Sequence, residues 1–154
     1  MYIRSPSSVS SARAHPAPTF VRWLTSWVST NRVSSPSQSP EIVKHALANL
    51  DSPQVLERSP LIDLPVISTR RSAAELRALL VDVVADVSES RAPRDAEAGC
   101  LLLDYYVKRV GTHEVTMERL NLSRPTYYRR LRRGHILVTN QINSLCNFAA
   151  RFPD

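Results

Sequence analysis

Five arginines close together are the residues of this chain whose type and spacing most clearly indicate a binding chemistry. They lie in the segment Leu120–Gly134, whose sequence is LNLSRPTYYRRLRRG. The set is Arg124, Arg129, Arg130, Arg132 and Arg133. Each guanidinium group carries a permanent charge and five N–H donors in a fork that fits phosphate oxygens. The segment therefore predicts a surface that binds a polyanion.

The same segment has one apolar side if it is helical. At 100° per residue, Tyr127, Leu131 and Gly134 share that side. The opposite side carries Pro125, Thr126, Arg129, Arg132 and Arg133. Further along, four residues continue the apolar side: Val138, Ile142, Leu145 and Ala149. We therefore expect one helix over about 124–149, with Gly134 in close contact with a neighbouring helix and Ile136 pointing outward.

A short polar turn, Asn121-Leu122-Ser123, comes directly before this helix. Asn tolerates left-handed backbone angles better than other non-glycine residues, and Ser123 can cap the helix that follows. A second short helix is expected over Thr112–Leu120, with Thr112 as its cap and Val115 and Leu120 facing inward. Helix, tight turn and basic helix form the layout of a helix-turn-helix, expected at about 112–134.

The preceding residues predict a small all-α bundle of about five to six helices over residues 39–150. Ser-Pro pairs at 39–40 and 52–53 predict helices over 40–50 and 53–58, and a third pair at 59–60 opens an irregular connector over 61–65. A helix over about 94–110 should end at Gly111.

The cleanest amphipathic helix is expected over 73–89, after the capping box Ser72–Glu75. Its apolar stripe is Leu76, Leu79, Leu80, Val83, Val84 and Val87. We expect the stripe to pack in the core; a homodimer contact is the alternative.

Residues 1–38 are rich in Ser, Pro and Arg, and residues 1–40 contain no acidic residue. Such a composition predicts a disordered tail, because it buries too little apolar surface to offset the loss of chain entropy. Phe20, Trp23, Leu24 and Trp27 allow a short docking helix at 19–29. An organellar transit peptide is a further alternative for this end of the chain.

The formal net charge of +6 is unevenly distributed. Residues 101–154 carry nine basic and four acidic side chains, whereas residues 41–100 carry seven basic and ten acidic ones. This excess favours a polyanionic partner. Cys100 and Cys146 lack disulfide or metal-site spacing, and no apolar run could span a bilayer, so we expect a cytoplasmic protein with reduced, half-buried thiols.

Catalysis is not expected. His15, His45, His113 and His135 lack metal-ligand spacing, and His113 beside Glu114 reads as a surface pair at a helix start. Only three glycines occur, none in a phosphate-binding loop, and no nucleophile motif is present. We therefore expect no cofactor, no metal and no enzymatic activity.

The turn and the start of the basic helix resemble a motif of bacterial helix-turn-helix domains related to region 4 of sigma factors. That motif is L-G-[IL]-S-x-x-T-[YV]-[YK]-R, and the matching run here is Leu120-Asn121-Leu122-Ser123-Arg124-Pro125-Thr126-Tyr127-Tyr128-Arg129-Arg130. Residues 101–111 are similar to the L-L-x-x-R-Y-x-x-G segment that precedes it in those domains. Residues 45–61 are similar to an A-L-x-x-L…L-x-x-S-P-L block of one bacterial branch. The resemblance covers roughly residues 41–145 and implies DNA binding in transcription regulation, without catalysis.

Four positions depart from that pattern. Asn121 stands where the turn glycine is usual, and Thr116-Met117 stands where Val-Ala is usual. Pro125 replaces a polar or basic residue on the surface that would approach DNA.

For DNA binding, residues near the helix start should lie nearest the bases: Ser123, Arg124, Thr126 and Arg129. The phosphate contacts should come from Tyr128, Arg130, Arg132 and Arg133. About 4–5 phosphate contacts would give a log–log salt slope near −4. The rival hypothesis is a protein-interaction module that docks on transcription machinery through the stripe at 76–87 or through Trp23 and Trp27.

Overall fold

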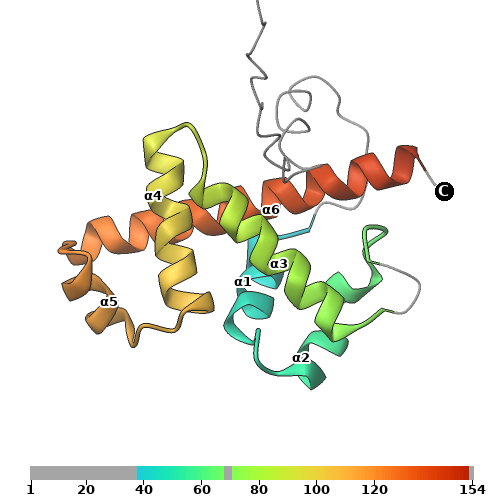
Figure 1. Ribbon diagram of the computed structural model, residues 1–154, viewed down its shortest axis with the longest axis horizontal. Helices are drawn as coiled ribbons and strands as arrows, with labels where there is room; N and C mark the ends of the chain where they lie inside the picture. Colours follow the sequence, from blue (N-terminus) through green and yellow to red (C-terminus); the bar gives the residue numbers. More distant parts are fainter. Residues whose placement is uncertain (1–37, 68–70, 153–154) are drawn as a thin grey trace, which may run out of the picture. The chain divides into compact units, whose positions relative to one another are not determined.

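The computed structural model describes residues 38–67 and 71–152, which lie in one compact unit spanning Arg32–Asp154 (Figure 1). These residues are all-α, with no strand among them, as expected. The elements in order are α1 (Pro40–Ala48), α2 (Pro53–Glu57), the 3-10 helix η3 (Pro60–Asp63), α3 (Ala73–Ser88), α4 (Pro93–Leu102), the π-helical η4 (Leu103–Val107), α5 (His113–Arg119) and α6 (Arg124–Arg151). The expected N-terminal tail and its helix at 19–29 lie outside the described residues.

Serine caps fix the starts of several elements. Ser39 Oγ accepts from the backbone N–H of Ile42 at the start of α1, and Ser72 Oγ accepts from that of Ala74 at the start of α3. Ser59 caps η3 in the same way, so the expected irregular connector is in fact a short 3-10 turn. These caps satisfy donors that the first helical turn leaves unpaired.

The helix expected over 94–110 is shorter and changes its winding. The α-helical part ends at Leu102, and η4 continues it with a wider turn closed by the Lys108 N–H to Leu103 C=O hydrogen bond of 2.8 Å. The chain then leaves the helix before Gly111, with Arg109 in the left-handed region at φ 49°. The wider turn carries two neighbouring tyrosines that bind different elements: Tyr106 hydrogen-bonds to α6, and Tyr105 hydrogen-bonds to α5.

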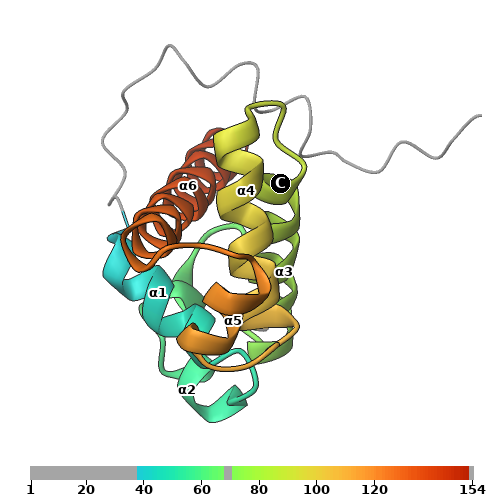
Figure 2. The same ribbon diagram turned by 90° about the vertical axis from the view of Figure 1, so that its left-hand side faces the viewer.

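α6 is the central element of the described unit and packs against α1, α3 and α4 (Figures 1 and 2). Its buried side is the one expected as far as Ile142, and the helix continues without a break past Gly134. Beyond that point Leu145 and Ala149 are only partly buried, and Cys146 is the buried residue. A Cβ on Gly134 would lie 2.8 Å from Leu102 Cδ1 and 3.2 Å from the Ala98 carbonyl oxygen. The absence of a side chain there lets α4 cross α6 closely. Ile136 is exposed, as expected.

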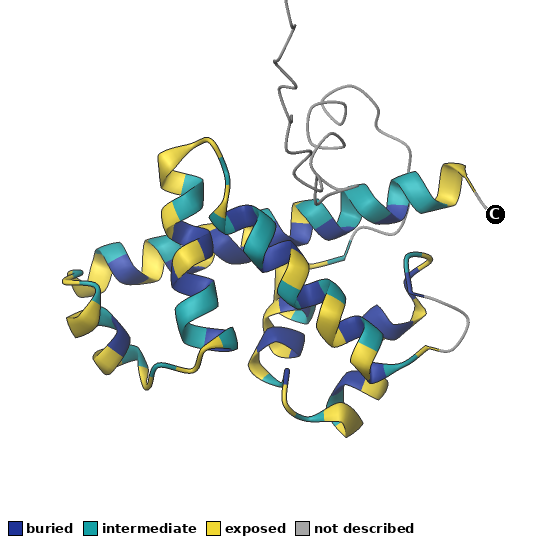
Figure 3. Ribbon diagram, in the orientation of Figure 1, coloured by how far each residue is buried: buried dark blue, intermediate teal, exposed yellow. Residues whose placement is uncertain are grey.

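The apolar stripe of α3 forms part of the core (Figure 3). Five of its six residues are buried, and only Leu79 is partly exposed. The alternative of a homodimer contact would need the stripe to be exposed, whereas other helices of the same chain cover it. The residues of that contact were Leu76, Leu79, Leu80, Val83, Val84 and Val87. The two cysteines are free, and they differ from the expected half-burial because Cys100 is exposed and Cys146 is buried.

Candidate nucleic-acid interface

The turn between α5 and α6 is closed by backbone hydrogen bonds. The Leu122 N–H donates to the Met117 C=O and the Asn121 N–H donates to the Glu118 C=O, both at 3.0 Å. Asn121 has φ 50°, the left-handed conformation expected for it. These are the two bonds of a Schellman motif, with Asn in the place usually taken by glycine. The motif ends α5 and directs the chain into α6 within four residues.

The start of α6 is exposed and polar. Ser123 occupies the N-cap position, but its hydroxyl donates to Thr126 Oγ1 at 2.9 Å and does not cap a backbone N–H. Arg129 Nη2 lies 3.5 Å from the same Thr126 oxygen. The three side chains Ser123, Thr126 and Arg129 therefore lie together at the beginning of the helix, on the outer side where Pro125 is also exposed.

α6 contains six arginines and no acidic residue. Among the described residues, Arg124, Arg129 and Arg132 form no ion pair and are exposed. Arg124 lies with its guanidinium carbon 5.8 Å from the centre of the Tyr128 ring, which is itself 39% exposed. An open groove of about 600 Å³ follows on the same helix, lined by Tyr128, Arg129, Arg132, Arg133, Ile136 and Leu137. We call Ser123, Arg124, Pro125, Thr126, Tyr128, Arg129 and Arg132 the open face of α6.

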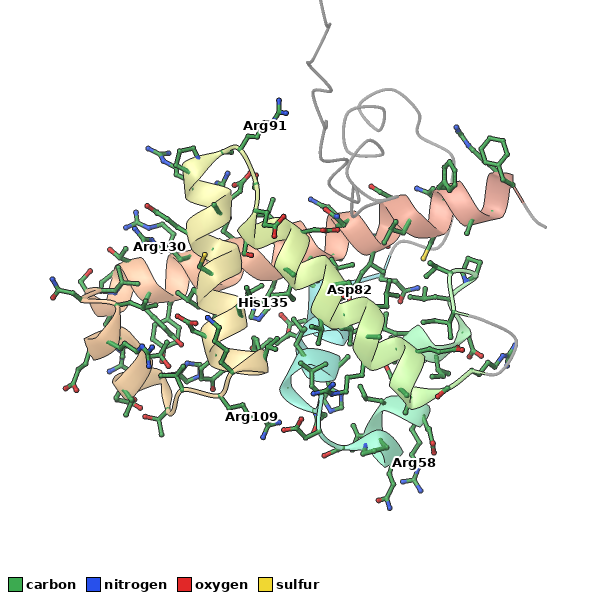
Figure 4. The ribbon with its side chains drawn as sticks, viewed as in Figure 1. Arg58, Asp82, Arg91, Arg109, Arg130 and His135 are labelled. Carbon is green, nitrogen blue, oxygen red and sulfur yellow. The ribbon has the colours of Figure 1, made fainter. Side chains whose placement is uncertain are left out.

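Arg130 and Arg133 differ from the other arginines because each is paired with a carboxylate of α4. Arg130 Nη2 lies 2.8 Å from Glu97 Oε2. Arg133 donates from both Nε and Nη2 to Asp95 Oδ1, at 2.6 Å each. Figure 4 shows Arg130 where α4 crosses α6. The sequence grouped all five arginines together, whereas the structure separates three free cations from two neutralised ones.

His113 joins α5 to its neighbours. Its Nε2 lies 3.0 Å from the Tyr105 hydroxyl of η4, and its Nδ1 lies 2.8 Å from the Tyr127 hydroxyl of α6. The Tyr105 ring stacks on the imidazole with centroids 4.3 Å apart. Burial raises the pKa of Tyr127 to about 12, with the neighbouring tyrosines adding to the shift, so this hydroxyl keeps its proton. His113 thus bridges three elements, a role that the sequence did not suggest, while it also lies beside Glu114 at the start of α5 as expected.

The inward side of α5 also differs from expectation. Thr116 is fully buried, and its hydroxyl donates to the Thr112 carbonyl oxygen at 2.9 Å. Val115, expected to face inward, is 46% exposed. Thr116 is one of the positions that depart from the helix-turn-helix pattern the sequence resembles, and its internal hydrogen bond explains how a polar side chain is accommodated there.

Within residues 38–67 and 71–152, no cluster of three or more His, Cys, Asp or Glu side chains could hold a metal ion. No helix in that part of the chain is both long enough and apolar enough to cross a bilayer. Comparisons with protein-family models, with curated proteins and with solved structures find no match to this chain.

Proposed function

We propose that this protein binds double-stranded DNA through the helix-turn-helix α5–α6 and regulates transcription. The observation that carries the proposal is a Schellman turn that leads directly into an exposed, arginine-rich and acid-free helix start. Helices of this kind enter the major groove with their first turns, where guanidinium groups reach guanine edges and phosphates. The sequence resemblance to region-4 helix-turn-helix domains supports the same function.

The open face assigns roles within this proposal. Ser123, Arg124, Thr126 and Arg129 lie in the first two turns and are nearest to the bases and flanking phosphates. Arg132 and the Tyr128 hydroxyl, further along, hold the DNA backbone. Pro125 has no side-chain hydrogen-bonding group, so base specificity depends on its neighbours.

The open face is tested by removing two of its free cations. Arg129→Ala combined with Arg132→Ala should weaken binding to a short duplex at least ~10-fold, because two phosphate or base contacts disappear. Binding is measured by fluorescence anisotropy with the full chain at fixed salt. Selection of bound sequences from a random duplex library then shows whether a preferred site exists and whether it is a two-fold repeat.

The matched control is Arg58→Ala combined with Arg151→Ala. Both residues are exposed, and Arg151 lies on α6 roughly 28 Å from Arg132 at 1.5 Å per residue. This variant has the same change in net charge and should keep most of the affinity. Equal losses in the two variants would mean that overall charge, and not the open face, determines binding.

The rival function is docking on transcription machinery or on a larger regulatory protein. Of the surfaces first considered for it, the α3 stripe is in the core and does not favour docking, whereas Trp23 and Trp27 lie outside the described residues and stay a prediction. Ile136 is exposed and Leu137 partly exposed, and both line the groove beside the open face, where such a partner could bind. A protein partner that still binds the Arg129→Ala, Arg132→Ala variant while DNA does not would separate the two functions.

A further inference from the structure

The first turns of α4 place two carboxylates against the arginine-rich part of α6. Asp95 accepts two hydrogen bonds from Arg133 at 2.6 Å, and Glu97 pairs with Arg130 at 2.8 Å. The Asp95 side chain is only 20% exposed, and that of Arg130 is 31% exposed. The other member of each pair is about half exposed, Glu97 at 48% and Arg133 at 50%, so each pair joins a partly shielded side chain to one that solvent reaches.

The packing of α4 on α6 holds these carboxylates in position before any ligand arrives. Gly134 directly follows Arg133 on α6 and lies against Leu102 and the Ala98 carbonyl of α4. Ala98, Leu101 and Leu102 of α4 are fully buried. A DNA phosphate that approaches Arg130 or Arg133 competes with a carboxylate that already neutralises the guanidinium charge within the same molecule, and such a preformed partner loses little entropy on pairing.

We infer that Asp95 and Glu97 withhold Arg130 and Arg133 from DNA phosphates and thereby lower sequence-independent affinity. This inference rests on the proposed DNA binding. Phosphate contacts carry no sequence information, whereas contacts from the first turns of the helix to base edges do. Neutralising two of five guanidinium groups leaves Arg124, Arg129 and Arg132 as the free cations of the segment. α4 is then a determinant of specificity although it touches no base.

The test is Asp95→Asn combined with Glu97→Gln in the full chain. The amides keep the size of the side chains and remove their charge, so both arginines become available to phosphate. Affinity for a duplex of mixed sequence should increase several-fold, and the log–log salt slope should steepen from about −3 to about −4.5, because each added phosphate contact contributes about −0.9. Affinity for a duplex that contains a selected site should rise less, so that the ratio of selected-site affinity to mixed-sequence affinity falls.

The control is Asp82→Asn combined with Glu57→Gln, which makes the same change in net charge on exposed parts of α3 and α2. Asp82 is labelled on α3 in Figure 4. The control should leave the salt slope unchanged.

An unchanged slope in the α4 variant, weaker duplex binding by that variant, or an equal change in the control would each overturn the inference. If the unaltered chain binds duplex and only the α4 variant fails to respond, the proposed function stands without this inference; if the unaltered chain binds no duplex, both fail.

Discussion

His135 is a titratable side chain in the core, 6% exposed, on the buried side of α6 (Figure 4). Its Nε2 lies 3.0 Å from the Tyr106 hydroxyl, and its backbone carbonyl oxygen accepts from the Thr139 hydroxyl at 2.7 Å. Burial lowers the pKa of His135 to about 4, with the charge of Lys44 adding to this and that of Glu41 opposing it. The imidazole is therefore neutral in the folded protein near pH 7.

This histidine should make stability depend on pH. Between pH 6.5 and about 4 the unfolded chain binds a proton that the folded chain does not, so the free energy of unfolding falls as pH falls through that window. The loss attributable to His135 should reach about 3 kcal/mol at the lower end. Urea denaturation at several pH values measures it.

The comparison variant is His135→Gln, which keeps a hydrogen-bonding side chain but does not titrate. Its stability should vary less than that of the unaltered chain between pH 7 and 4, whatever its absolute value. Parallel pH profiles for the two proteins would show that His135 is not the group responsible.

Side-chain partners were the part of the site that sequence reasoning could not find. His113, Tyr105 and Tyr127 belong to three different elements, separated by 8 and 14 positions, and no helical period links them. The pairing of Arg130 and Arg133 with α4 likewise depends on how two helices cross. Both sets of contacts result from tertiary packing, and local propensity and capping patterns contain no information about such packing.

At the scale of elements, the turn before α6 determines where the open face begins. Asn121 adopts φ 50°, and the two hydrogen bonds that flank it reverse the chain after α5. A non-glycine residue other than Asn or Asp in the left-handed conformation lowers the free energy of unfolding by roughly 1–2 kcal/mol. The side chain at this one position therefore affects the stability of the whole helix-turn-helix.

Asn121→Ala should lower the free energy of unfolding by about 1 kcal/mol, whereas Asn121→Gly should leave it equal or slightly higher. The reason is that glycine adopts the left-handed conformation without steric strain and alanine does not. Urea denaturation of both variants measures the difference. An alanine variant as stable as the glycine variant would contradict the geometry assigned to this turn.

Helix boundaries were largely predictable because their signals are local. The helix expected over 73–89 is α3 at Ala73–Ser88, and the helix expected over 124–149 is α6 at Arg124–Arg151. Serine caps and apolar periodicity determine both. The helix expected over 94–110 is found as α4 and η4 over Pro93–Val107, but local signals did not predict the π-helical winding of its last turn, because the apolar pattern continues unchanged through Tyr105 and Tyr106.

At the scale of the described unit, α6 has two sides with different tasks. One side packs on α1, α3 and α4 over most of its 28 residues, and the other carries the open face in its first three turns. Tyr127 and Leu131 anchor the first turns in the core, which fixes the direction in which the helix backbone presents the open face. Because α6 continues without a break through Gly134, its core-packed part and its open face belong to one rigid helix.

The charge on that surface is smaller than the sequence alone suggests. Counting all arginines of the segment gave about 4–5 phosphate contacts, whereas the structure leaves three cations free, Arg124, Arg129 and Arg132. The salt slope expected from the sequence, near −4, is accordingly revised to about −3.

The most direct test of the account is the affinity of the full chain for a short duplex of mixed sequence, measured as a function of salt concentration. We expect measurable binding whose log–log slope is about −3, set by three free guanidinium groups. A chain that binds no duplex, or one whose binding constant does not change with salt, would contradict the assignment of the open face of α6 as a DNA-binding surface.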